Sequence, residues 1–255
     1  MYYLEISKAI YKANTGDGVK FYFMRLFILL LLLFSFVRLS AQKNIHAQWT
    51  NCLQQYVDDD GRVNYSDWAK DTTALDNYIE DLEANPPVEY WSKNDSLAYF
   101  INAYNAVTVK LILDNYPLKS IRRLITPWRF KRFTLHDKSV SLNQIEHGIL
   151  RKMNEPRIHF AINCASASCP KLSNRAYVSH SLTAQLEEAT RNFITDPSKN
   201  RITANKLSLS RIFQWFARDF GSKRERVAFI QRYSKIPIEV DAAVNFISYD
   251  WTLNQ

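Results

Sequence analysis

Apolar residues recur at the spacing of an α-helix in several parts of the chain. Between residues 96 and 115 they cover every side of the predicted helix, which is typical of a helix surrounded by protein. Ser141 and Gln144 have the spacing of a capping box, which begins a helix with Ile145 and Ile149 on its apolar side. The remaining helices are predicted at residues 45–57, 66–84, 181–195, 208–219 and 223–233.

Alternation of apolar and polar residues is rarer and marks short strands. It is clearest from Arg157 to Cys164, which we predict to be the best strand of the protein. Residues 133–141 give two shorter strand-like pieces around a turn, and residues 62–65 and 244–251 are also extended. Because no repeat or flexible linker divides the chain, we expect one α+β domain, predominantly helical and packed around a small antiparallel sheet.

The N-terminal region has the pattern of a secretory signal peptide. An apolar run from Leu26 to Val37 follows Met24 and is followed by small residues up to Ala41. Its twelve residues are fewer than the roughly 20 that a membrane-spanning helix needs. We therefore expect translation to start at Met24, cleavage after Ala41, a globular domain over residues 42–255 and a periplasmic or extracellular location. An uncleaved segment is the alternative, and it is the only membrane contact that we expect.

Charge narrows the choice of partners only slightly. Removing residues 1–41, which carry five Lys/Arg and two Asp/Glu, lowers the formal net charge from +8 to +5. The remaining cations are dispersed, with acidic residues between the groups, which favours solvated faces over nucleic-acid binding. We therefore expect a small-molecule or peptide ligand and no nucleic acid.

The segment from Arg157 to Pro170 concentrates the side chains that can carry chemistry. It holds two of the three cysteines, Cys164 and Cys169, around four small residues that allow a tight turn. The third cysteine, Cys52, lies in an amphipathic stretch and is most simply a core residue. Further candidate residues in this segment and on the two preceding helices are His159, Asn163, Glu146, His147, Arg151, Asn102 and Asn105.

Several blocks of sequence together resemble the domain of unknown function 547 family. These blocks are FINAYNAVTVKLIL, SLNQIEHGILR, RIHFAINCASASCP, IFQWFARDF and SYDWTLN, and they span residues 95–255. The resemblance implies a domain type without an established activity. It marks the candidates named above except Arg151, and it adds Arg157, Ser168 and Pro170. Ala165 departs from the family, where many relatives carry glycine. Because plant members carry serine in place of the second cysteine, the resemblance favours Cys164 as the reactive sulfur.

The first hypothesis is a cysteine nucleophile. A thiol needs a base, a group that orients the base, and donors for the developing oxyanion. In this hypothesis Cys164 attacks, His147 is the base, and the amides of residues 165–169 form the oxyanion hole. Glu146 or the two helix asparagines orient the base, and His159 is a weaker alternative base. The reaction class is hydrolysis or acyl transfer on peptide or cell-envelope material, without a cofactor.

Three alternatives remain open. A disulfide between Cys164 and Cys169 would pin the loop and suits an exported protein. A zinc site from these cysteines, His147 and His159 has suitable ligands, but their spacing matches no standard zinc pattern, and we expect no metal. A binding module would instead use Arg157, His159, Asn163 and Arg151 to hold an anionic or sugar ligand without turnover.

Overall fold

The computed structural model describes residues 25–29 and 45–255, and the chain divides into two units, 1–44 and 45–255. In the first unit residues 25–29 are helical and exposed. The rest of the predicted signal segment and its cleavage site lie outside the described residues. The second unit contains the elements that position the candidate site.

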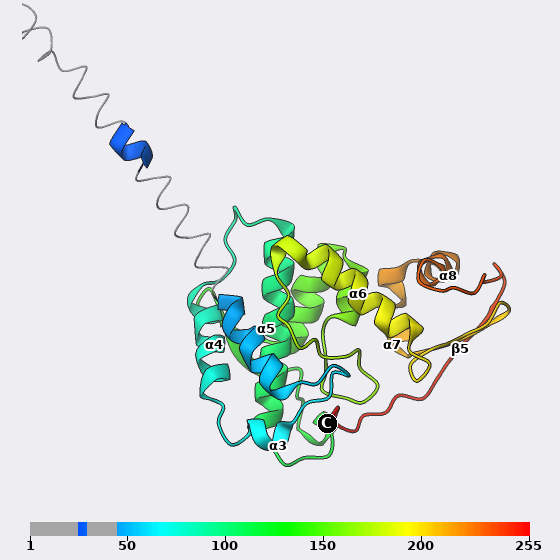
Figure 1. Ribbon diagram of the computed structural model, residues 1–255, viewed down its shortest axis with the longest axis horizontal. Helices are drawn as coiled ribbons and strands as arrows, with labels where there is room; N and C mark the ends of the chain where they lie inside the picture. The colour runs from blue at the N-terminus through cyan, green and yellow to red at the C-terminus, as the bar shows by residue number, and fades with distance from the viewer. Residues whose placement is uncertain (1–24, 30–44) are drawn as a thin grey trace, which may run out of the picture. The chain divides into compact units, whose positions relative to one another are not determined.

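Helix α5, Lys93–Leu113, forms the centre of the second unit. It begins with a capping box between Ser92 and Asp95, and from Leu97 onward nearly all of its side chains are buried. The prediction of a helix surrounded by protein is confirmed. By length and composition α5 could cross a membrane, but 89% of its most apolar window is buried inside the protein, so we assign it as a core helix. Helical residues 45–56 and helix α4 (Thr73–Ala84) pack around it (Figure 1).

The single helix predicted over residues 66–84 is wrong. The structure has two helices there, α3 (Tyr65–Trp68) and α4 (Thr73–Ala84). Asn64 caps the first by accepting from the backbone N–H of Asp67. The side chain of Asp71 accepts the backbone N–H of Thr73 at 2.9 Å, which turns the chain between the two helices.

A hairpin and a short irregular helix follow α5. Strands β1 (Lys131–Leu135) and β2 (Lys138–Ser141) pair antiparallel, as predicted. The capping box is confirmed, because Ser141 and Gln144 exchange backbone-to-side-chain bonds of 2.9 and 3.2 Å. The helix that it begins is a π-helix, η2 (Gln144–Ile149), and continues as the 3₁₀-helix η3 (Leu150–Met153). π-Helical turns occur frequently at functional sites.

The strand predicted from Arg157 to Cys164 is wrong. Residues Pro156–Phe160 form a 3₁₀-helix, η4, which begins with proline and is capped by the Glu155 side chain. The alternation was misleading because both sides of the segment are buried. Ile158 packs in the core around α5, whereas Phe160 packs in a second core.

The second core is built around an aromatic cluster. Phe160 lies with its ring centroid 5.1–6.1 Å from four others, Phe193, Phe213, Phe220 and Phe229.

The helices predicted at residues 181–195 and 223–233 are confirmed as α6 (Leu182–Thr195) and α8 (Lys223–Gln231). The elements that follow η4 are η5 (Ser179–Ser181), α6 (Leu182–Thr195), β3 (Arg201–Ile202), β4 (Lys206–Leu209), α7 (Ile212–Trp215), η6 (Ala217–Phe220), α8 (Lys223–Gln231) and β5 (Ala243–Phe246).

The helix predicted at residues 208–219 is only partly present. Its first residues belong to β4, in which Leu207 and Leu209 alternate toward the core, and α7 and η6 make up the remainder. The side chain of Asn200 accepts the backbone N–H of Ser210 at 3.0 Å where the strand ends.

The described residues therefore form an α+β fold, as predicted, with two small sheets. The β1–β2 sheet is antiparallel, whereas in the second sheet β4 pairs antiparallel with β3 and parallel with β5. After β5 the chain runs back from the α8 end toward the middle of the unit (Figure 1). This return brings the C-terminal tail against the loop of residues 163–170, which holds Cys164 and Cys169 and is called the cysteine loop below.

Candidate functional site

Two buried asparagines hold the start of the loop of residues 163–170. The backbone N–H of Asn163 donates to Asn105 on α5 at 2.8 Å, and the Asn105 amide donates to the carbonyl of Ala161 at 2.9 Å. The Asn163 side chain spans the loop, since it donates to the carbonyl of Pro170 at 2.7 Å and accepts the backbone N–H of Ala165 at 2.7 Å. Asn105 and Asn163 thus fix the loop, and neither lines the cavity described below.

The C-terminal tail holds the other side of the loop. The backbone N–H groups of Ala167 and Ser168 donate to the carbonyls of Thr252 and Asp250 at 2.7 and 3.1 Å. The Ser168 hydroxyl accepts the backbone N–H of Asp250 at 2.8 Å. The amide of Cys169 also bonds inside the loop, so four of the five loop amides proposed for an oxyanion hole are already used. That part of the nucleophile hypothesis is wrong, because the hydrogen bonds of these four amides already hold the loop in its conformation.

The two loop cysteines are free and face each other. Their sulfurs are 2.6 Å apart. Three further groups donate to the sulfur of Cys169: the backbone N–H of Cys164 at 3.0 Å, the Ser166 hydroxyl at 3.2 Å and the Tyr249 hydroxyl at 3.3 Å. The sulfur of Cys164 lies 3.3 Å from the Ser166 hydroxyl and 3.5 Å from the Tyr249 hydroxyl. Among the described residues no imidazole nitrogen lies within hydrogen-bond distance of either sulfur.

These contacts separate the pKa values of the two thiols. The hydrogen bond to Cys169, together with burial, raises the pKa of Cys164. Burial also tends to raise the pKa of Cys169, but the hydrogen bonds from Cys164, Ser166 and Tyr249 outweigh it and lower this pKa below that of an ordinary thiol. The surroundings therefore favour a thiolate on Cys169 rather than on Cys164.

Glu146 on the π-helix η2 is the buried carboxyl of the site. It is 8% exposed, and the Tyr104 hydroxyl on α5 donates to it at 3.3 Å. Burial raises its pKa to about 7, against the lowering effect of the Tyr104 hydrogen bond. At neutral pH a substantial fraction of Glu146 is therefore a carboxylic acid, which can donate a proton.

The two histidines belong to a network around Asp219 of η6. His159 Nε2 lies 2.7 Å from Asp219, and Arg151 makes two bonds of 2.6 Å to the same carboxylate. An Arg151 nitrogen lies 2.9 Å from His147 Nδ1, and the His159 ring stacks on Phe216 at 4.0 Å. Burial lowers the pKa of both histidines. The hydrogen bonds from Arg151 and His159 outweigh burial at Asp219 and hold its pKa well below the usual range.

Both histidines, both loop cysteines and Glu146 line one cavity of about 390 Å³, the thiol cavity, whereas Arg151 and Asp219 do not. This volume is within the range of small-molecule sites. The rest of the wall is mainly aromatic and apolar, and includes Tyr104, Trp128, Ile162, Ile212, Trp215, Phe216, Tyr249 and Trp251.

Two predicted binding residues lie elsewhere. Asn102 exchanges bonds of 2.7 and 2.9 Å with the backbone of Tyr177, so it joins α5 to the segment before α6. Arg157 pairs with Glu155 at 2.7 and 2.8 Å. The zinc site that remained open as an alternative is not assembled, because the described part of the chain contains no group of three His, Cys, Asp or Glu side chains placed to hold a metal ion.

The sequence reasoning missed Asp219, Tyr249 and the tryptophans of the cavity wall. Asp219 is 60 residues from His159, and Tyr249 is 80 residues from Cys169. A signal was available, because both lie within the resemblance blocks IFQWFARDF and SYDWTLN. Neither block contains cysteine or histidine, so neither stands out in the sequence as a candidate for thiol chemistry.

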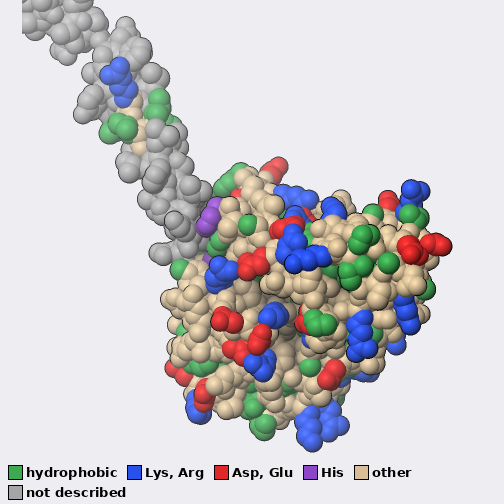
Figure 2. All heavy atoms as spheres, turned by 45° about the vertical axis from the view of Figure 1, so that its right-hand side comes forward, with side chains coloured by type: hydrophobic (Ala, Val, Ile, Leu, Met, Phe, Trp, Pro, Cys, Tyr) green, Lys and Arg blue, Asp and Glu red, His purple; other side chains and the backbone are tan. Residues whose placement is uncertain are grey.

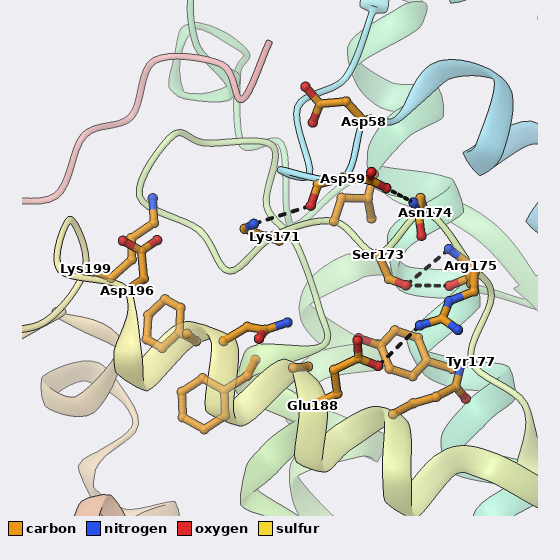
Figure 3. Close-up of a pocket in the computed structure, with 16 residues that line it drawn as sticks. Asp58, Asp59, Lys171, Ser173, Asn174, Arg175, Tyr177, Glu188, Asp196 and Lys199 are labelled. Atoms are coloured by element: carbon orange, nitrogen blue, oxygen red, sulfur yellow. Dashed lines mark hydrogen bonds and ion pairs between the residues drawn. The ribbon is translucent and has the colours of Figure 1, made fainter. Parts of the chain in front are cut away.

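A second hollow lies between the Asp58–Asp59 turn and α6 (Figure 3). Its volume is about 110 Å³, smaller than typical small-molecule sites. Its charged and polar groups bond one another: Asn174 donates to Asp59 at 2.9 Å, and Arg175 donates to Glu188 at 3.2 Å. The thiol cavity is therefore the stronger candidate.

The fold and the cavity define a class: an α+β domain with an aromatic pocket that contains a thiol pair and a buried carboxyl. Residues 88–194 match the model of a family described as protein of unknown function, DUF547, which confirms the resemblance over that stretch. The match includes Glu146, the two histidines and both loop cysteines, and it ends before Asp219 and Tyr249. No curated protein and no solved structure matches the chain.

Proposed function

We propose that the protein is a thiol-dependent hydrolase or acyl transferase, with peptide or cell-envelope material as its substrate class. The observation that carries this proposal is the set of donors that converge on the sulfur of Cys169 at the wall of an aromatic cavity. Stabilising a thiolate is the first requirement of such catalysis. Cys169 thereby replaces Cys164 as the proposed nucleophile.

The reaction would use two groups of the cavity wall. The Cys169 thiolate forms a bond to the carbonyl carbon, and the leaving group departs with a proton from Glu146. Water then attacks the thioester, its proton passes to the Glu146 carboxylate, and the Cys169 thiolate is released. A carboxyl with a pKa of about 7 can serve in both steps near neutral pH. The Asp219–Arg151 network keeps His159 in place beside the cavity.

Alkylation kinetics test the thiolate. We expect iodoacetamide to label Cys169 faster than a model thiol at pH 7, with the apparent pKa of the reaction below the ordinary thiol value. Cys169→Ser should abolish this fast phase. Cys52→Ser is the matched control, because Cys52 is a buried free cysteine in the core around α5 and should leave the fast phase intact. A fast phase that survives Cys169→Ser, or its absence in the native chain, would refute the proposal.

The short distance between the two sulfurs favours a second candidate function. In an oxidising compartment Cys164 and Cys169 could exchange with a disulfide-bonded partner, which would leave as two thiols, and the new disulfide would pin the loop of a non-catalytic binding module. Intact mass after alkylation separates the two candidates. If the disulfide-pinned module is correct, protein recovered from the exporting cell will carry two alkyl groups fewer than fully reduced protein. If the thiol-dependent enzyme is correct, the two samples will carry the same number.

Export is part of the same proposal, and the apolar run from Leu26 to Val37 supports it. N-terminal sequencing of protein from the exporting cell tests the site of cleavage. We expect the mature chain to begin at Gln42. A chain that retains Met24 would contradict cleavage and leave an N-terminal anchor.

A further inference from the structure

Residues 119–132 form an unusually basic segment at the mouth of the thiol cavity. Elsewhere the charges are mixed, as Figure 2 shows for one face, where Lys/Arg and Asp/Glu side chains are interspersed. This segment has six Lys/Arg and no Asp/Glu. None of its cations forms an ion pair with another described residue, whereas cations such as Arg157 and Arg175 pair with carboxylates. The segment therefore presents uncompensated positive charge.

The same segment exposes large apolar side chains. Ile125 is 84% exposed, more than any other large hydrophobic residue in the described part of the chain, and Phe130 is 54% exposed. Exposed Ile and Phe side chains contribute little to folding, although the Arg132 guanidinium lies 5.5 Å from the centroid of the Phe130 ring. An apolar surface rimmed by charge marks an interaction site. Binding to phosphate groups alone would not require the exposed aliphatic side chain of Ile125 at the tip of this segment.

The fold fixes this segment instead of leaving it loose. Ile121 in η1 (Ile121–Arg123) is fully buried at one end, and Phe133 is 1% exposed at the other. Between them the carbonyl of Trp128 accepts the backbone N–H of Asn143 at 2.8 Å. Residues 126–129 also line the thiol cavity, so whatever binds the segment lies beside the cavity mouth.

We propose that residues 119–132 dock the protein on an anionic lipid surface. The six cations meet the lipid headgroups, and Ile125 and Phe130 enter the boundary between headgroups and acyl chains. Charge complementarity selects an anionic surface, and the exposed aliphatic tip selects lipid over a soluble polyanion. This contact is distinct from any anchoring by residues 26–37, and it places the cavity mouth at the membrane. It does not depend on the proposed thiol chemistry.

Vesicle binding of the full chain tests the charges. Phosphatidylcholine vesicles with and without phosphatidylglycerol are compared, and the N-terminal segment is the same in every protein. The charge variant removes three cations of the segment: Lys119→Gln, Arg123→Gln and Lys131→Gln. The control removes three exposed cations on α8 and in the segment after it: Lys223→Gln, Arg224→Gln and Lys235→Gln. We expect the charge variant to bind the anionic vesicles on the order of a hundredfold more weakly, and the control to lose far less. Equal losses in the two variants would overturn the proposal.

A second pair of variants tests the apolar tip. Ile125→Ser with Phe130→Ser should weaken binding to the anionic vesicles by about tenfold or more, while Val240→Ser, at a site that is 72% exposed, should not. Hydrogen exchange adds a local measurement, in which anionic vesicles should protect peptides from residues 119–132 but not peptides from α8. Full binding by the serine double variant, or equal protection by dextran sulfate, would show a soluble polyanion site and refute lipid docking.

Discussion

Replacing Glu146 by glutamine should stabilise the protein above pH 7 and leave its stability almost unchanged at pH 4, below both pKa values of this carboxyl. Burial raises the pKa of Glu146 from 4.5 to about 7, so the folded protein holds this proton to a higher pH than the unfolded chain does. Stability is therefore lost as the pH rises from about 4.5 to about 7. At about 1.4 kcal/mol for each pKa unit, the loss is about 3 kcal/mol. Glutamine keeps an acceptor for the Tyr104 hydroxyl and never ionises.

Urea denaturation followed by tryptophan fluorescence measures this effect. At pH 8 the Glu146→Gln variant should unfold at a urea concentration about 1.5 M higher than the native chain, for a denaturant dependence of about 2 kcal/mol per M. At pH 4, below both pKa values, the two midpoints should coincide. Glu80→Gln, at an exposed position, controls for the loss of one carboxyl. If the urea midpoints of Glu146→Gln and the native chain differ by the same amount at both pH values, Glu146 is hydrated and its pKa is not raised. The proposed proton donor would then be ruled out.

Three further predictions concern the groups that hold the site. Asn105→Ala leaves the carbonyl of Ala161 and the backbone N–H of Asn163 without their hydrogen-bond partner. It should lower the free energy of unfolding by about 2–4 kcal/mol in a urea titration. Asp219→Asn should destabilise the protein at pH 7. Because bonding lowers the pKa of Asp219, the deficit should shrink as the pH falls below about 4 in the same assay. Tyr249→Phe removes a donor to Cys169, so the pKa of that thiol, followed by thiolate absorbance, should rise, and an unchanged pKa would contradict the donor assignment.

Helices with local signals could be predicted from the sequence. Helix α5 is apolar on every side, and α6 has the periodicity of an amphipathic helix. The capping box between Ser141 and Gln144 involves residues three apart, so its bonds follow from spacing alone. Such features depend on a few neighbouring residues, and the fold class followed from them.

The segment from Arg157 to Cys164 shows where local patterns lose their meaning. Alternation identifies a strand only when one face is exposed, but this segment runs between two cores and is buried on both sides. The site was only partly predictable for a related reason. Glu146, His147, His159 and the two cysteines lie in adjacent segments. Asp219 reaches them from η6, 60 residues from His159, and Tyr249 reaches them through the return of the C-terminal tail.

The way in which the loop is held limits the chemistry that the cavity can perform. Four loop amides bond to Asn163, the C-terminal tail or the loop itself, so they are not free to stabilise an oxyanion. Apart from the amide of Ser166, the donors that remain for an oxyanion beside Cys169 are side chains. The Tyr249 hydroxyl and the protonated Glu146 are the donors at the cavity wall with suitable chemistry. Activity should therefore fall as the pH rises past about 7, where Glu146 loses its proton, although the Cys169 thiolate persists. A histidine-based mechanism needs a neutral base, and because burial lowers the pKa of both histidines below the ordinary value, its activity would not fall as the pH rises past 7.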